Sequence, residues 1–514
     1  MSRHVSVLAS LACNYLATAC QIVCGLAIVP IAIRSLGDAG YGTWLSLTAL
    51  AAVGGFADMG VSGVLVVRLS RALEQARHGE ARSELLNGLA VAGGASIVGG
   101  ILVLFTVIGA ETLSPQSFAA SSHGVFVAVA IAVTSIMSQF SWSLAALPTS
   151  QLRPLVNGVI GIATPLAWLV SSGVLVPMFG IVGLAVGLVI RAVVGFVPLC
   201  IYNIAFLARS QADEHGGLDL GRCRSFAMLG GSSLAVRWIQ SVLAGFDILC
   251  VSTTQGPGAA TLYANTARPT GMATGLANAF GGALLPAFTR FLAREQGPPA
   301  FRLFLNSLRL TVIMAGALAI SFVGVRRQFL TAWVGPHFIL PTPLTLAIAT
   351  AAIASTALAF ASYMFGSTGK LVQTHGLMCV EGAVRIALMA CGAYLFGSLG
   401  LAVAATPTPM VATLLILVGM ARFTGVRIGA AEWLTLVADV ALIITGLVLA
   451  SMLPEVPLHV WQIPFAAAFC GGVALLVLTL RSAPLRQMLL EVAHAVLPPG
   501  IRRVLPSAVG GVSP

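Results

Sequence analysis

Ionisable side chains inside apolar segments are the residues of this 514-residue chain that could do chemistry. These side chains are Arg191, Arg237, Arg268, Arg309 and Arg385, with Asp58, Asp247, Glu381 and Asp439. A charge at the centre of a lipid-embedded helix costs at least about 2.5–3.5 kcal/mol, so each is expected to face the protein interior or a watery cavity. Guanidinium groups stay charged and grip phosphate oxygens in pairs, whereas a carboxylate can exchange a proton. The arginines therefore indicate an anionic ligand, and the carboxylates indicate coupling to an ion.

These charges, with some polar neighbours, fall into three candidate roles. Four arginines are predicted to bind an anionic headgroup: Arg191, Arg237, Arg268 and Arg385. Four carboxylates are candidates for ion coupling: Asp58, Asp247, Glu381 and Asp439. Sugar contacts are predicted for Gln139, Trp142, Tyr263 and Asn265, although such residues more often serve helix packing alone.

The charges also have purely structural interpretations. Glu381 and Arg385 are four residues apart on one helix face, so mutual neutralisation is as good an explanation as function. Arg309 falls near a cytoplasmic helix end, where its long side chain is expected to reach the interface. Asp58 has no cation near it in the sequence, which favours a functional role.

The elements that must position these residues are membrane helices. Hydrophobic residues make up 58% of the chain and charged residues only 8%, with a mean hydropathy of +0.97. Soluble domains carry roughly 25% charged residues. Runs of about 20 apolar residues, enough to span a bilayer as a helix, recur from Leu11 to Leu480. The composition therefore predicts an all-α polytopic membrane protein.

The apolar runs predict fourteen membrane helices. The predicted spans are 11–33, 43–67, 86–109, 123–147, 154–177, 181–207, 226–252, 260–287, 303–325, 341–365, 376–396, 399–420, 431–452 and 460–480. Lysine and arginine gather in alternate connections, while the other connections hold only Arg34, Arg326 and Arg327. By the positive-inside rule, both termini are predicted to be cytoplasmic.

An internal repeat predicts how these helices are grouped. The segment Phe179–Val186 reads FGIVGLAV and Phe396–Val403 reads FGSLGLAV, and both join the last two helices of a six-helix set. A six-helix offset keeps the orientation, so two parallel lobes are expected. The predicted domains are lobes at 1–207 and 226–420, a cytoplasmic linker at 208–225, two additional helices at 431–480 and a cytoplasmic amphipathic tail at 481–514.

Several other classes of function find no support in the sequence. The net charge of +11 lies mostly between helices, so it does not indicate nucleic acid. Gly366–Lys370 is similar to the end of a phosphate-binding loop, but Met364 and Leu371 occupy positions where that loop needs glycine and serine or threonine. No HExxH, GxSxG or CxxC motif occurs, so neither a metal nor a cofactor is expected.

Several motifs resemble those of bacterial polysaccharide biosynthesis flippases. The segment Leu36–Trp44, followed by Asp58–Gly60 and Arg68, is similar to the first helical hairpin of these O-antigen and exopolysaccharide exporters. They belong to the multidrug/oligosaccharidyl-lipid/polysaccharide (MOP) superfamily. Further similarities are Asp247, Leu262–Tyr263, Arg268 and Leu285–Pro286 in the seventh and eighth helices, and Trp333–Gly335 and Gly369–Lys370 later in the chain.

This resemblance implies a transporter and not an enzyme. Its expected cargo is an undecaprenyl-pyrophosphate-linked oligosaccharide, moved across the bacterial inner membrane by alternating access. The cavity arginines would hold the pyrophosphate, while the polyprenyl tail stays in membrane lipid. Polymerase and export proteins of the same pathway are expected partners.

Four alternatives remain at this stage. One is a flippase for a lipid-linked peptidoglycan precursor, and another is a cation-coupled multidrug antiporter, whose cavity should hold more acids than arginines. A membrane-embedded polymerase or ligase would need a sizeable outer loop, whereas the outer connections at 111–122 and 326–340 are short. A scaffold without transport activity is the last alternative.

Overall fold

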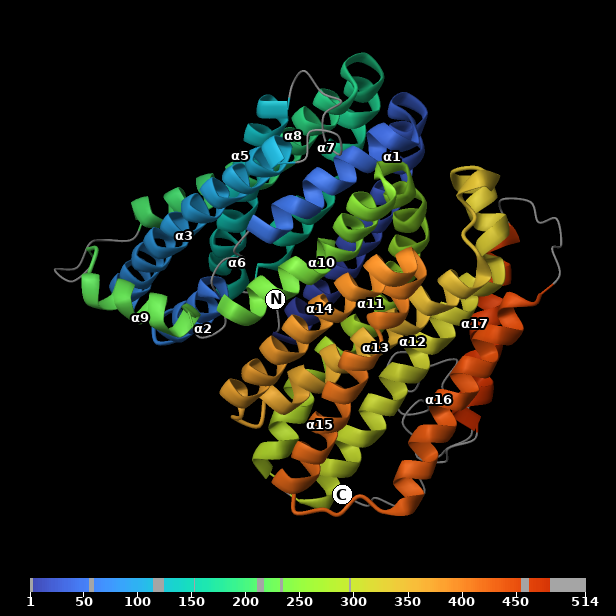
Figure 1. Ribbon diagram of the computed structural model, residues 1–514. Coiled ribbons are helices and arrows are strands. Elements are labelled where there is room, and N and C mark those ends of the chain that lie inside the picture. The colour runs from blue at the N-terminus through green and yellow to red at the C-terminus, as the bar shows by residue number, and fades with distance from the viewer. Residues whose placement is uncertain are drawn as a thin grey trace. The chain divides into compact units, whose positions relative to one another are not determined.

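The protein is helical in every part that the structure describes. The computed structural model describes residues 3–54, 60–113, 124–151, 153–209, 217–231, 234–294, 297–453 and 462–480. Within these ranges all regular elements are helices, and no strand occurs (Figure 1). The prediction of an all-α protein is confirmed.

Ten helices in the described ranges are long and apolar enough to cross a membrane, and Ile463–Val477 is a shorter apolar helix. A multi-pass membrane protein is therefore confirmed. Two of the ten, Leu16–Ala52 and Leu371–Phe423, contain a glycine with non-helical torsions, Gly37 and Gly397 respectively. Each of these two long stretches thus consists of successive helical segments.

The chain packs as two compact units. Unit 1 comprises Met1–Ala264 and Met378–Leu401, and unit 2 comprises Asn265–Leu377 and Ala402–Pro514. The helices of unit 1 are α1 (Arg3–Gly54), α2 (Val61–Glu74), α3 (His78–Leu113), α5 (Gly124–Leu144), α6 (Ala146–Ser150), α7 (Pro154–Phe179), α8 (Ile181–Arg209), α9 (Leu220–Gly231) and α10 (Leu234–Gln255), with the start of α11 (Pro257–Arg294) and most of α14 (Leu371–Ala404). Unit 2 holds the remainder of α11 and α14 with α12 (Pro298–Trp333), η1 (Pro336–Phe338), α13 (Thr342–Gly366), α15 (Pro407–Phe423), α16 (Ala430–Ser451) and α17 (Ile463–Leu480).

Small residues set the helix packing of unit 1. Helix α1 lies against α7, α3 and α10, while α3 lies beside α5 and α7 beside α8 (Figure 1). Gly158 and Gly161 of α7 lie directly on Cys13 and Ala17 of α1, where a β-carbon would leave too little room. In a bilayer, helices associate through such close backbone approach, because burial from lipid provides no hydrophobic driving force.

The two copies of the sequence repeat adopt the same turn. Gly180 has φ 58° and ψ −130°, and Gly397 has φ 63° and ψ −148°. Three residues later, Gly183 and Gly400 each lie against the backbone carbonyl of the residue eight positions before them. Only glycine fits both requirements without strain, which explains why both copies keep the two glycines.

The surroundings of the two turns also correspond. One turn lies next to Leu36, which precedes Gly37, and the other lies next to Gln255, which precedes Gly256. Gly37 and Gly256 both have positive φ angles, of 70° and 92°. The same pairing of turns therefore occurs at two places in the chain, in the order that the predicted repeat requires.

Helix α12 forms the centre of unit 2. Its buried face packs against α13, α16 and α17. Gly316 of α12 lies against Ile443 of α16, and Gly446 of α16 lies against Ile320 of α12. Reciprocal glycines therefore hold α16 close to α12 over about one turn.

Two predicted spans differ from the observed helices. The predicted span 226–252 is divided between α9, which ends at Gly231, and α10, which begins at Leu234, with residues 232–233 outside the described ranges. Helix α9 carries Arg222 and Arg224, and its first residues are too polar for the bilayer core. The predicted span 43–67 is divided between α1 and α2, with residues 55–59 outside the described ranges.

Candidate functional site

Arg191 and Trp168 form the first part of the candidate site. The Arg191 guanidinium, on α8, lies 5.2 Å from the centroid of the Trp168 ring, on α7. Both side chains are half-buried inside segments long and apolar enough to span a membrane. A cation over an indole face gains about 0.5–2 kcal/mol, more where water is excluded. We call this pair the arginine–tryptophan pair.

The local sequence brings the arginine–tryptophan pair together. One turn from Arg191, Gly187 lies against Ser172, which is one turn from Trp168 on α7. Gly195, one turn away on the other side of Arg191, lies against Thr164. Glycines on both sides of the arginine therefore let α7 and α8 approach closely. The facing surface of α7 at this level is polar.

The arginine–tryptophan pair has unused hydrogen-bonding capacity. Arg191 makes no ion pair with any carboxylate in the part of the chain that the structure describes. The indole Nε1 of Trp168 and the hydroxyl of Ser172 are buried and have no hydrogen-bond partner there. A charged guanidinium in this setting is suited to an anionic ligand, and the indole and hydroxyl could bind polar groups of the same ligand.

Four other predicted residues come together elsewhere in unit 1. Arg385 on α14 interacts electrostatically with Glu381 on the same helix, with Asp247 on α10 and with Tyr263 on α11. Glu381 and Tyr263 are buried, while Asp247 and Arg385 are half-buried. Close packing positions the group, because Gly382 lies directly on Ile239 of α10. We call these four residues the charge cluster.

The charge cluster combines one cation with two carboxylates and a phenol. Sequence spacing alone relates Glu381 to Arg385, and the structure adds Asp247 from a helix more than 100 residues earlier. Arg385 is therefore shared between two acids, and gain or loss of a proton by either acid would change the net charge of the cluster. Such a group can respond to an ion gradient.

The remaining predicted residues lie apart from these two groups. Arg237 is exposed on α10, Trp142 is 71% exposed on α5, and Gln139 is half-buried beside Gly99. Arg268 and Asn265 belong to unit 2, where Asn265 is buried with both amide atoms lacking a hydrogen-bond partner among the described residues. Asp58 lies outside the described residues.

Asp439 and Arg309 form a buried ion pair in unit 2. The Nε of Arg309, on α12, donates to Oδ2 of Asp439, on α16, at 2.7 Å. The two residues are 8% and 4% exposed. The expectation that Arg309 reaches the interface is therefore wrong, because its carboxylate partner comes from a helix 130 residues later. Asp439 already neutralises a buried cation.

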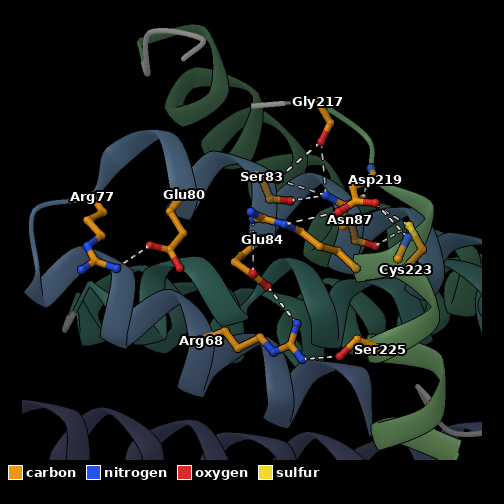
Figure 2. Close-up of polar contacts among 12 residues, drawn as sticks. Arg68, Arg77, Glu80, Ser83, Glu84, Asn87, Gly217, Asp219, Cys223 and Ser225 are labelled. Carbon is orange, nitrogen blue, oxygen red and sulfur yellow. Dashed lines mark hydrogen bonds and ion pairs between the residues drawn. The ribbon is translucent and has the colours of Figure 1, made fainter. Parts of the chain in front are cut away.

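A polar network around Glu84 was missed by sequence reasoning. Glu84, on α3, is 9% exposed and bridges Arg68 of α2, at 3.2 Å, and Arg222 of α9, at 3.4 Å (Figure 2). Arg68 also donates to Ser225 at 2.7 Å and stacks over Phe226 at 4.5 Å. In the sequence, Arg68 belongs to the motif that resembles the first helical hairpin, and Arg222 is one of the positive charges between helices. Two acids at the start of an otherwise apolar helix, Glu80 and Glu84, were the available signal.

Asn87 extends this network to the segment that precedes α9. Its amide nitrogen donates to the Gly217 carbonyl at 3.3 Å, and its amide oxygen accepts from the Asp219 backbone N–H at 2.8 Å (Figure 2). The thiol of Cys223 lies 3.2 Å from the same oxygen. Helix α9 is thus fixed to α2 and α3 by side chains from both of them.

Comparison with known proteins assigns the chain to a family. The sequence pattern of the family described as "Polysaccharide biosynthesis protein" matches residues 9–292, more than half of the chain. The chain belongs to this polysaccharide biosynthesis protein family. No curated protein sequence matches it.

Solved structures similar to this polysaccharide biosynthesis protein are transporters. One is the inward-facing conformation of a multidrug resistance MATE family transporter of the MOP superfamily, with 15% identity, a TM-score of 0.54, and coverage of 81% of this chain and 98% of that chain. Another is the Vibrio cholerae MATE transporter VcmN in the bent form, with 14% identity, a TM-score of 0.53, and coverage of 82% and 98%. At such identities the likeness establishes a shared fold.

The family and the fold together support a flippase or exporter. The predicted resemblance to polysaccharide biosynthesis proteins is confirmed, and the fold is shared with a transporter that belongs to the MOP superfamily. In such a protein, the arginine–tryptophan pair offers an anion site, and the charge cluster offers groups that can change charge.

Proposed function

We propose that this protein moves an undecaprenyl-pyrophosphate-linked oligosaccharide from the cytoplasmic to the periplasmic leaflet of the bacterial inner membrane. The cargo would be an exopolysaccharide or O-antigen repeat unit. The observation that carries the proposal is Arg191, a half-buried arginine that rests on Trp168 and has no carboxylate partner among the described residues. A pyrophosphate supplies the missing negative charge, and an indole can also stack on a sugar ring.

The proposed topology has fourteen crossings, two parallel six-helix lobes, two additional helices and cytoplasmic termini. The non-helical glycines Gly37 and Gly397 support it, because each divides a long helical stretch into two segments, as two successive membrane crossings require. The matching turns at Gly180 and Gly397 support the parallel repeat. Alternating access would then arise from movement of the lobes about the linker at 208–225.

Ion coupling is assigned to the charge cluster. Asp247 and Glu381 both act on Arg385, so protonation of one acid would weaken its hold on the arginine. Arg385 could then exchange an internal carboxylate for a substrate phosphate. This proposal gives Asp439 no coupling role, since its charge is already neutralised by Arg309.

A cation-coupled multidrug antiporter is the second candidate. It is favoured by the two carboxylates of the charge cluster and by the shared fold with the inward-facing multidrug resistance MATE family transporter. Its cavity would need to attract cations, whereas Arg191 repels them. The two candidates thus predict cargoes of opposite charge.

The test is a translocation assay with purified protein in liposomes. A fluorescent pyrophosphate-linked oligosaccharide lipid is followed by its protection from an external quencher, with and without an ion gradient. Protein-dependent protection is expected, and protein-free liposomes provide the control. Absence of protection, together with gradient-driven efflux of a cationic dye, would favour the antiporter and refute the proposal.

A further inference from the structure

Arg326 is a deeply buried arginine near the end of α12. Its side chain is 3% exposed, and its Nη1 donates to the Val323 carbonyl at 3.2 Å. Its Nη2 donates to the hydroxyl of Thr342, the first residue of α13, at 2.7 Å. A buried charge is stable only where it finds compensation, and both of these acceptors are neutral.

One edge of the Arg326 guanidinium has a hydrogen-bond donor that is not used. Its Nε–H is buried without a hydrogen-bond partner among the described residues. Nε and Nη2 lie on the same edge of a guanidinium, and Nη2 points to Thr342, so this edge faces the start of α13. A buried charged donor left unpaired is costly, which indicates that an acceptor normally reaches this edge.

The start of α13 attracts anions. The helix has no side-chain cap at Pro341 and no acid in its first turn. Its first backbone N–H groups have no acceptor within the helix, and here they belong to Thr342 and Leu344, since Pro343 has none. The aligned peptide dipoles make this end of the helix positive.

The sequences of α12, η1 and α13 supply no negative charge to this site, and Glu455, two residues after the Leu453 that lies against Gly324 of α12, is outside the described residues. Arg327 follows directly and repels Arg326. Residues 297–377, which include all of α12, η1 and α13, contain no aspartate or glutamate. This end of unit 2 therefore brings together two adjacent arginines and the positive end of a helix. None of the three elements provides a carboxylate to neutralise them. In the proposed topology they lie on the outer side of the membrane, where the positive-inside rule disfavours arginine.

We propose that this end of unit 2 binds a phosphate group, held by the Nε–Nη2 edge of Arg326 and the first N–H groups of α13. A guanidinium edge matches two phosphate oxygens, and a helix N-terminus contributes further donors. The phosphate could belong to a phospholipid headgroup or be free in solution. This site is distinct from the arginine–tryptophan pair and does not depend on the proposed transport.

The experiment measures binding of phosphatidylglycerol and of inorganic phosphate to the purified full-length protein. Retained phosphatidylglycerol is counted by native mass spectrometry over a range of lipid concentrations. Arg326→Gln is expected to weaken binding at least about tenfold, because a charged hydrogen-bond partner is lost. Arg326→Lys keeps the positive charge but loses the paired donors Nε and Nη2, so it should weaken binding less than Arg326→Gln. Arg302→Gln, an exposed arginine at the other end of α12, is the matched control.

The outcomes separate the two sources of phosphate. If inorganic phosphate displaces the lipid from the Arg326 site, the phosphate group alone is recognised. If binding depends on Arg326 but inorganic phosphate does not compete, the site holds a lipid headgroup. If Arg326→Gln elutes as a folded protein and binds both probes like wild type, the proposal is overturned. Should Arg326→Gln fail to fold, equal binding by Arg326→Lys and wild type would overturn it instead.

Discussion

The buried ion pair between Arg309 and Asp439 allows a prediction with a magnitude. Its nitrogen and oxygen are 2.7 Å apart, and both residues are more than nine-tenths buried. Removing one partner leaves the other charge in a medium that solvates it poorly. Arg309→Met or Asp439→Leu alone should therefore lower the free energy of unfolding by about 3–5 kcal/mol.

The double variant should behave differently from either single one. With both charges replaced by apolar side chains of similar length, no buried charge remains and the packing between α12 and α16 is largely kept. Replacement of a whole buried pair is often neutral or stabilising. We therefore expect the double variant to be more stable than either single variant, with a coupling energy of at least about 2 kcal/mol.

The assay is denaturant unfolding in detergent or lipid nanodiscs, followed by tryptophan fluorescence. Arg302→Met removes an exposed arginine from the same helix and should change the free energy by less than about 0.5 kcal/mol. Additive effects of the two single variants would refute the reasoning. So would two single losses no larger than that of the control.

Three further predictions concern unit 1. Glu84→Gln should raise the rate of backbone hydrogen exchange in α9 about tenfold, because both arginine contacts of a mostly buried carboxylate are weakened. Equal exchange in wild type and variant would show that other contacts hold α9. Gly397→Ala should lower the thermal unfolding temperature, since a φ of 63° costs about 1–2 kcal/mol for a residue with a β-carbon. An unchanged unfolding temperature would mean that the turn relaxes freely. Asp247→Asn and Glu381→Gln should each weaken the dependence of transport on an ion gradient, and dependence that survives in both would place coupling elsewhere.

Composition and spacing could predict the parts of the fold that have local causes. Apolar runs predicted the helices, because each helix must satisfy its own backbone in lipid. The repeated glycines at Gly180 and Gly397 predicted equivalent turns, and the torsions agree. Helix ends were harder to predict, since polar residues can extend a helix beyond the bilayer. Helix α11, for example, reaches Arg294, although the predicted span ends at 287.

Contacts between distant helices could not be predicted. Arg309 was expected at the interface because its partner Asp439 lies 130 residues away, and nothing in either segment identifies the other. The partners of Glu84 could not be predicted for the same reason, since Arg222 reaches it only once α9 packs against α3. The sequence could mark Glu381 and Arg385 as a pair, but not the approach of Asp247.

The most direct test of the central claim is the rate at which Arg191 variants translocate the fluorescent pyrophosphate-linked oligosaccharide lipid. Arg191→Gln should reduce the rate at least about tenfold, because a charged hydrogen-bond partner of the phosphate is lost. Arg191→Lys should keep part of the activity, while Arg77→Gln, which changes an exposed arginine in the same unit, should leave it intact. Translocation by Arg191→Gln at the wild-type rate would contradict the account.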